Sequence, residues 1–289
     1  MSTPNESFAE RMKNHQIWWA GENGIASLLE RRKDGGPSWV LRDEHKTKNL
    51  KDASWWKYIE GKEHRWARSL LSSQCFAVNL FGPMKHNSTL AKEVFLNLIT
   101  HRTLESDDTV NVSFEYTPTR GPKWLGETRQ PTQIDVCFTI QRFNQFIGYL
   151  LIEVKFTESE FGSCRGAAES TPKKPGNPNP SWCLDLQSVI ANPKERCWMA
   201  DTKENGRRYW EYMLSPDAPF HFSTSAPCPF RHSLYQLMRN QVMASALVQE
   251  GSAIGLISGS VFILQIHWYG GFHPPLKAKP MPLRPLKIY

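Results

Sequence analysis

Two carboxylates and a lysine stand where an enzyme could hold a divalent cation and a phosphate. Asp135 lies in the alternating segment "TQIDVCFTI", and Glu153 and Lys155 lie two positions apart in "GYLLIEVKFT". Successive side chains of a strand point to opposite faces, so Glu153 and Lys155 share one face of their strand. If the two strands pair, Asp135 and Glu153 converge. With the carbonyl of Val154 they would form an oxygen site that suits Mg2+ or Mn2+.

Lys155 is the third residue with a chemical role at this site. Its amine is placed to orient or help deprotonate a water and to stabilise the charge that builds on a transferring phosphate. The combination predicts metal-assisted hydrolysis of a phosphodiester. The alternative is a cross-strand salt-bridge face on an exposed sheet, although such pairs contribute only about 0–1 kcal/mol.

The elements that must position these residues follow from the hydrophobic pattern. Three alternating segments separated by turn residues predict an antiparallel meander over 110–116, 132–140 and 148–157. Apolar spacing predicts helices over 63–81 and 90–104, and the first should stop at Gly82 and Pro83. Further along, helices are expected in "GRRYWEYM" and "RHSLYQLMRNQVMASALVQE", and a strand in "SVFILQIHW" at 260–268.

The strand motif resembles the PD-(D/E)xK nuclease superfamily, whose signature is an Asp on one strand and a (D/E)-x-K triplet on the next. Asp135 and the triplet Glu153-Val154-Lys155 match in residue type, spacing and strand context, and Ile134 replaces the namesake proline. Four stretches, in chain order, look like a poorly characterised bacterial group of this superfamily: "SSQCFAVNLFGPM", "PTQIDVCFTI", "IEVKFTESEFGSCRG" and "CPFRHSLYQLMRNQVMASAL". The resemblance covers roughly residues 60–265.

The resemblance implies a fold and an activity. The fold would be α/β, of the restriction-endonuclease-like class, with a central mixed β-sheet flanked by α-helices. The activity would be that of a Mg2+-dependent DNA nuclease. The helix over 63–81 would precede the catalytic strands, and a second helix would follow them with its polar face over the site.

That second helix supplies further candidates. In "YQLMRNQ", Tyr235, Gln236, Arg239 and Asn240 lie three and four positions apart and share a face. We expect Gln236 to assist catalysis and Arg239 to bind nucleic acid, and the alternative is an ordinary surface helix edge. Glu115 in "SFEYTP" has two interpretations: a third metal ligand, or a solvent-facing residue of an edge strand.

The net charge favours a polyanionic partner. The chain has 35 Lys and Arg against 28 Asp and Glu, a formal net charge of +7. Arg207 and Arg208 in "ENGRRYWE" and the aromatic and basic stretch "WWKYIEGKEHRWAR" are candidate contacts to nucleic acid. The plainer alternatives are a soluble protein with a positive surface, and tryptophans that belong to the core.

Six cysteines divide into two groups. Cys75 and Cys137 stand in apolar segments, so we expect small buried side chains. The other four follow the triplet in loop-like surroundings: Cys164, Cys183, Cys197 and Cys228. Four thiolates can hold Zn2+ or an iron–sulfur cluster, and free thiols are the alternative.

The chain is expected to divide into three regions. We expect an N-terminal helical extension over 1–55, a nuclease domain over 56–270 with a loop or metal-binding insertion around 164–228, and a basic Pro-rich tail over 271–289. No apolar run has the length of a membrane helix and no signal peptide is visible, which predicts a cytoplasmic protein. Two other functions stay open: a non-cleaving nucleic-acid-binding or scaffold subunit of a defence or repair complex with a protein partner, and an RNA or nucleotide phosphodiesterase.

Overall fold

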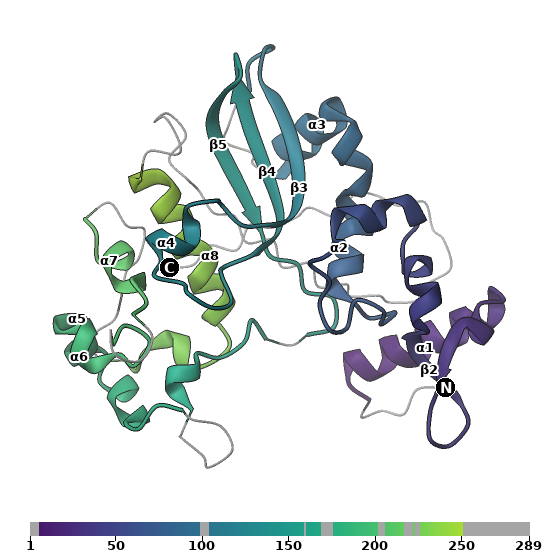
Figure 1. Cartoon of the computed structure of the whole chain (residues 1–289), viewed down its shortest axis with the longest axis horizontal. Helices are drawn as coiled ribbons and strands as arrows, with labels where there is room; N and C mark the ends of the chain where they lie inside the picture. Colours follow the sequence, from purple (N-terminus) through teal and green to yellow (C-terminus); the bar gives the residue numbers. More distant parts are fainter. Residues whose placement is uncertain are drawn as a thin grey trace.

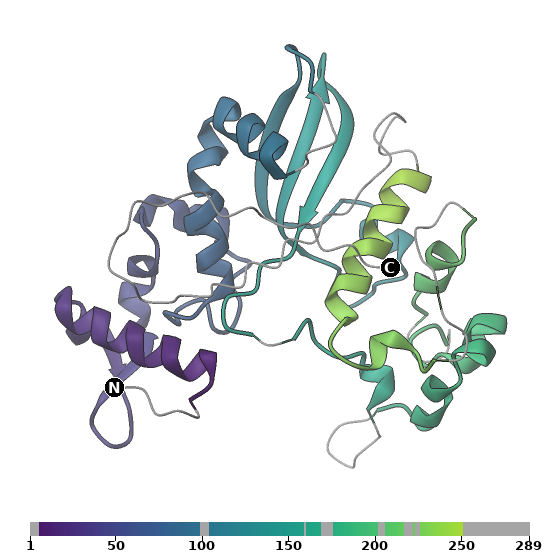
Figure 2. The same cartoon turned by 180° about the vertical axis from the view of Figure 1, so that it is seen from behind.

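A three-stranded antiparallel sheet stands between two groups of helices (Figures 1 and 2). The computed structural model describes residues 6–98, 104–158, 160–168, 176–201, 206–216, 222 and 226–250. The strands, in sheet order, are β3 (Thr109–Tyr116), β4 (Ile134–Arg142) and β5 (Gln145–Ile152). One face packs on α2 (Ser73–Phe81) and α3 (Ser88–Leu98), and the other on α4 (Gly121–Trp124), α7 (Tyr209–Met213) and α8 (Tyr235–Gln249).

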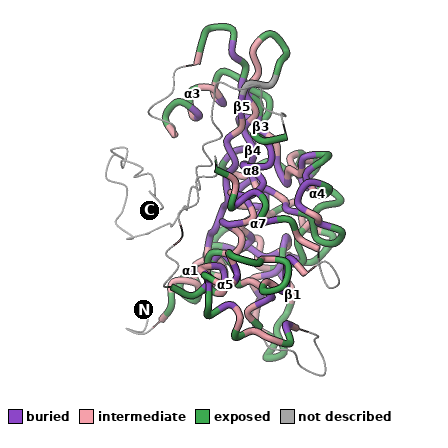
Figure 3. Tube along the Cα trace, turned by 90° about the vertical axis from the view of Figure 1, so that its left-hand side faces the viewer, coloured by how far each residue is buried: buried purple, intermediate pink, exposed green. Residues whose placement is uncertain are grey.

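Alternation along the strands divides the core in two. Val136, Phe138 and Ile140 of β4 belong to the cluster shared with α2 and α3, whereas Cys137 belongs to the cluster shared with α7 and α8. Both sheet faces are therefore covered, which Figure 3 shows as buried trace along the strands. Cys75 and Cys137 are buried as expected, and burial raises the pKa of the Cys75 thiol to about 11.

The remaining elements are short. The N-terminal part contains α1 (Phe8–Glu22) and a hairpin of β1 (Leu29–Arg31) with β2 (Pro37–Leu41). After the sheet come α5 (Leu186–Ala191) and α6 (Pro193–Arg196). Short 3-10 helices lie between these elements: η1 (Ala26–Leu28), η2 (Asp43–Asn49), η3 (Ala53–Tyr58), η4 (Gly82–His86), η5 (Arg165–Ala167), η6 (Pro180–Leu184) and η7 (Pro229–Arg231).

The α/β class and the meander are confirmed, with several corrections. The helix predicted over 63–81 begins only at Ser73, because the Ser72 hydroxyl accepts the Cys75 N–H at 3.2 Å and caps the helix there. The strands of the described residues pair only antiparallel, where a mixed sheet was expected. The N-terminal segment holds a hairpin as well as a helix.

The end of β5 and the limit of the described residues bear on two further expectations. The strand predicted over 148–157 ends at Ile152, so the triplet follows the strand and does not lie inside it. The strand at 260–268 and the tail at 271–289 lie outside the described residues. Within the described part of the chain, no helix is both long enough and apolar enough to cross a bilayer.

We predict that Phe138 locks the first layer of helices onto the sheet. Its fully buried ring contacts Phe81 of α2 edge-on, at 5.8 Å between centroids, and Phe95 of α3 at 6.4 Å. Phe138→Ala should lower the free energy of unfolding by about 3–5 kcal/mol, measured by chemical denaturation. Phe143→Ala makes the same change at a ring that is 76 % exposed in the β4–β5 turn and should leave the stability nearly unchanged. Equal losses in both variants would contradict this packing.

Candidate functional site

Three carboxylates form one row across the end of the sheet. Phe114 pairs with Val136 and Tyr116 with Ile134, so Glu115 of β3 lies opposite Asp135 of β4. Val136 pairs with Ile152, and continuing this register by one residue places Glu153 opposite Asp135 on its other side. The row lies at the lower end of the sheet in Figure 1. Antiparallel pairing therefore brings together three acids that are far apart in sequence.

Asp135 is the central acid of the row. Its Oδ2 accepts the Val154 N–H at 2.7 Å, two residues past the end of β5. Burial of the carboxyl group, followed by the nearby charge of Glu153, holds the pKa of Asp135 well above its usual value. The residue is still partly exposed, so a small ligand can reach it.

Glu153 is buried between two side chains. Its Oε1 lies 2.9 Å from the Lys155 ammonium, and its Oε2 accepts the Asn240 side-chain N–H at 2.9 Å. Burial lowers the pKa of Lys155, but the charge of Glu153 and the hydrogen bond to it outweigh burial and hold that pKa above its usual value. Lys155 is therefore an ammonium at neutral pH, which favours positioning and charge stabilisation over proton abstraction.

Glu115 is buried, so the solvent-facing alternative is wrong. It adopts the left-handed backbone region with φ +47°, which is strained for a residue with a Cβ. Gln74 of α2 donates its side-chain N–H to Oε1 at 2.5 Å. Oε2 is buried and lies 3.5 Å from His64 Nε2, with which it forms an ion pair when the imidazole is protonated.

The residues before α2 form the rim of the site, a position that their sequence pattern does not reveal. Lys62 donates its ammonium N–H to the Glu115 carbonyl at 2.9 Å, and the His64 backbone N–H donates to Gln74 Oε1 at 3.0 Å. The hydrogen bond to Glu115 is the main cause that raises the pKa of the half-exposed His64 imidazole. The one sequence signal was the basic run that contains both residues.

The structure places the helix candidates differently from the expectation. Asn240, and not Gln236, contacts the site; Gln236 donates its backbone N–H to the Phe161 carbonyl, and its side chain lies near Gly162. The Arg239 guanidinium binds Glu127, Gln130 and Thr132, and its nucleic-acid role stays a prediction. Gln236 and Asn240 lie about one helical turn apart, so the spacing of 3.6 residues per turn could not show which of the two contacts the site.

The two candidate arginines outside α8 also differ from each other. Arg207 is partly buried and donates to the Arg129 carbonyl at 2.7 Å, and its nucleic-acid role stays a prediction. Arg208 is exposed and lies 2.6 Å from Glu211, and its nucleic-acid role stays a prediction.

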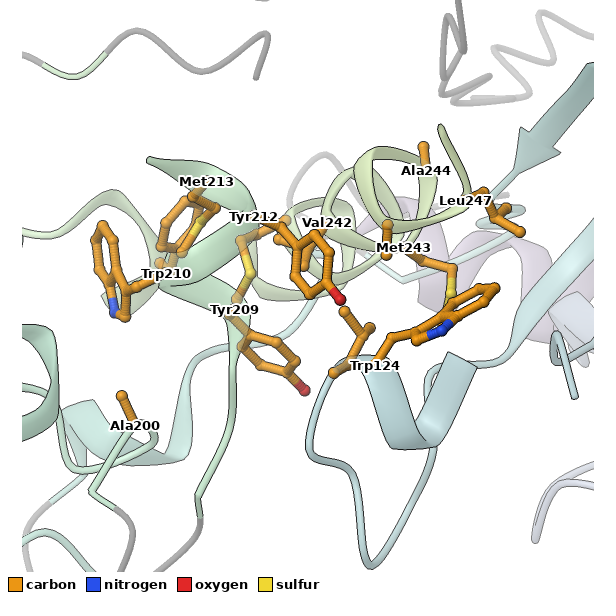
Figure 4. Packing of buried hydrophobic residues seen from close by; sticks show 14 of the residues in the cluster. Trp124, Ala200, Tyr209, Trp210, Tyr212, Met213, Val242, Met243, Ala244 and Leu247 are labelled. Carbon is orange, nitrogen blue, oxygen red and sulfur yellow. The ribbon is translucent and has the colours of Figure 1, made fainter. Parts of the chain in front are cut away.

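The four late cysteines meet, although they come from separate segments. All four line one cavity of about 30 Å³ between η5, η6, α6 and η7: Cys164, Cys183, Cys197 and Cys228. The surrounding core of α7 and α8 is drawn in Figure 4, where Tyr209, Trp210 and Met213 are labelled. Within the described residues, no three Cys, His, Asp or Glu side chains are already spaced as ligands of one ion, at the cysteines or at the carboxylate row.

A family model described as Restriction Endonuclease associating with ARP matches residues 15–258, most of the chain. The chain belongs to this family, REase-ARP. The matched part of the REase-ARP chain contains the carboxylate row, its rim and the four cysteines. This family match supports a restriction-endonuclease-like family and a nuclease-like role. Comparisons with curated proteins and with solved structures gave no match.

We predict that Asp135→Asn stabilises the metal-free protein at neutral pH. A carboxyl group whose pKa is raised by folding contributes stability below its unfolded pKa and loses it as the pH rises through the folded pKa. Asn keeps the acceptor for the Val154 N–H without the charge. In a chelator the melting temperature should rise by roughly 2–4 °C, about 1 kcal/mol, and the gain should shrink toward acid pH.

Asp108→Asn is the matched control with the opposite sign. The hydrogen bond and charge of Arg142, whose Nε lies 2.7 Å away, lower the pKa of Asp108, so its stabilisation is present above the unfolded pKa and lost in acid. This variant should melt lower at neutral pH and approach the parent protein in acid. A loss of stability at neutral pH in the Asp135 variant as well would show that Asp135 is not a repelled carboxylate.

Proposed function

We propose that this chain is a divalent-metal-dependent nuclease of the PD-(D/E)xK type that hydrolyses phosphodiester bonds of DNA. The observation that carries the proposal is the row of Glu115, Asp135 and Glu153 with the Lys155 ammonium beside it. Membership of a restriction-endonuclease family supports the same chemistry.

The donor set fits a hard divalent cation such as Mg2+ or Mn2+. Asp135, Glu153, Glu115 and the Val154 carbonyl would hold it with oxygen ligands. Burial, followed by the charge of Glu153, raises the pKa of Asp135, and Glu115 Oε2 is a buried acceptor whose ion-pair partner His64 is half exposed, so both carboxylates would gain from a bound cation. A bound cation would supply an acidified water and stabilise charge on the phosphate.

Lys155 and the two flanking helices position the reacting groups. The Lys155 ammonium stabilises negative charge on the phosphate and orients the attacking water. Asn240 from α8 fixes Glu153, and Gln74 from α2 fixes Glu115. The two outer acids are thus oriented from opposite sides of the sheet, which prepares the site before a substrate arrives.

The rim of the site fits a nucleic acid. His64 and Lys62 place positive charge beside the carboxylates. Next to them the Trp66 ring is 59 % exposed, and the Arg65 guanidinium lies 5.0 Å from its centroid. Exposed aromatic rings among basic groups bind bases by stacking and phosphates by charge. The family description also names an association with ARP, which supports a protein partner for this nuclease.

The test is a cleavage assay on purified protein with supercoiled plasmid, linear DNA and RNA, in Mg2+, Mn2+ or a chelator. We expect metal-dependent DNA cleavage that falls by at least roughly 10²-fold in Asp135→Asn and Lys155→Ala. Asp107→Asn, an exposed carboxylate at the far end of the sheet, is the control and should cleave normally.

Three outcomes would reject the proposal. One is no cleavage of any nucleic acid by the folded parent protein with each metal. The second is cleavage that survives in both site variants. The third is cleavage of RNA alone, which would move the activity to an RNA phosphodiesterase.

A further inference from the structure

Another cavity, larger than the one at the cysteines, is lined by residues of α6 and by the segment 206–214, which contains α7. This α6–α7 cavity has a volume of about 450 Å³. Pockets that bind small molecules measure roughly 300–1,000 Å³, whereas one water takes roughly 30 Å³ in the liquid. None of the described residues that line the cavity belongs to the carboxylate row. Its dimensions suit a small organic molecule bound apart from that row.

Positive charge exceeds negative charge around this cavity. Lys194, Arg207 and Arg208 line it, and Glu211 is the one acid among the described lining residues. The Arg208 guanidinium lies 2.6 Å from Glu211, so these two charges balance each other. The exposed Lys194 and the partly buried Arg207 carry the two remaining positive charges. An anion is therefore the ligand that the electrostatics favour.

Arg207 also has hydrogen-bond donors that lack an acceptor. Its side chain is only 12 % exposed, and its Nη2 donates to the Arg129 carbonyl at 2.7 Å. Nε and Nη1 are buried and have no hydrogen-bond partner in the described part of the chain. Nη1 lies 3.9 Å from Glu127 Oε1, too far for a hydrogen bond, and Arg239 binds the same oxygen at 3.2 Å. Buried donors without an acceptor are unfavourable, and a bound anion would accept them.

The backbone that carries the two arginines is fixed at both of them. Arg207 donates its N–H to the Met199 carbonyl at 2.9 Å, and Arg208 donates its N–H to the Leu125 carbonyl at 3.0 Å. A Cβ added at Gly126 would lie 2.2 Å from the Gly206 carbonyl oxygen, so a glycine is required where these two segments meet. The arginines are therefore held in position before a ligand binds, which lowers the entropic cost of binding.

Apolar side chains complete the lining of the cavity. Trp210 and Ala200 both line it and are labelled in Figure 4. The Trp210 ring is held by Phe222 and Phe230, with centroids 5.7 Å and 6.4 Å away. Leu214, which is 41 % exposed, also lines the cavity. Cations combined with an aromatic and an aliphatic side chain suit a ligand that joins an anionic group to a flat, weakly polar body, as a nucleotide does.

The amount of charge indicates which anion fits. A phosphate monoester carries about −1.5 to −2 charges at pH 7, which balances the two positive charges of Lys194 and Arg207. A phosphodiester or a carboxylate carries a single negative charge and would leave one cation uncompensated. Guanidinium groups also match the geometry of phosphate oxygens, with two parallel N–H donors.

We propose that the α6–α7 cavity binds a nucleoside monophosphate. The phosphate is bound by Arg207 and Lys194, and the nucleoside packs against Trp210 and Leu214. This site takes a terminal phosphate, whereas the contact to nucleic acid predicted for Arg207 and Arg208 would take phosphodiesters. The proposal does not depend on the nuclease activity of the carboxylate row.

The test is isothermal titration of the full chain, in a phosphate-free buffer with a chelator, with AMP, GMP, CMP and UMP. We expect at least one of them to bind. The matching nucleoside, inorganic phosphate and the matching 3′,5′-cyclic monophosphate, a diester, should each bind at least roughly 10-fold more weakly. No binding of any of the four nucleotides would overturn the proposal. Equally tight binding of the nucleoside, the free phosphate or the cyclic diester would overturn it as well.

Two variants in the same short helix place the ligand in the cavity. Lys194→Ala removes an exposed lining cation, so the fold should be kept and the affinity for the nucleotide should fall by roughly 10-fold. Arg196→Ala is the matched control, because its guanidinium lies 5.5 Å from the Trp182 ring centroid and does not line the cavity. The control should bind like the parent protein. Unchanged affinity in Lys194→Ala, or equal losses in both variants, would contradict the site.

Discussion

Repulsion among three carboxylates in one row is the constraint on which the site depends. Strand register places Glu115, Asp135 and Glu153 side by side, and like charges directly opposite each other destabilise a sheet. The structure offsets this cost with Lys155 on Glu153, Gln74 on Glu115 and a backbone N–H on Asp135. The compensation is incomplete, because burial and the charge of Glu153 keep the pKa of Asp135 raised. Such a site favours a cation.

The two layers of helices serve this row from opposite sides. α2 delivers Gln74 at its N-terminal end, and α8 delivers Asn240. The same α8 also lines the cysteine cavity with Tyr235 and Met238, one face of the helix serving each site. Its first backbone N–H groups bind the Phe161 and Gly162 carbonyls, just after the triplet.

The sequence predicted the elements with strong periodicity and the residues with strong chemistry. The meander, α8 and the α/β class followed from alternation and spacing, and the meander register brings Asp135 and Glu153 together as expected. Gln74 and His64 could not be predicted, because their roles depend on a strained Glu115 and on the turn before α2, which are tertiary features. The intramolecular partners of Arg239 and Arg207 were equally hidden, because the buried Glu127 that both guanidinium groups approach comes from a distant segment.

The most direct test of the central claim is a crystal structure of the protein with Mn2+, with the metal located by its anomalous scattering. The account predicts an ion between the carboxylates of Asp135 and Glu153, with Glu115 directly or through a water as a further ligand, and no ion in the same crystals of Asp135→Asn. A parent protein that shows no ion at the row at saturating Mn2+, or the same ion in the variant, would contradict it.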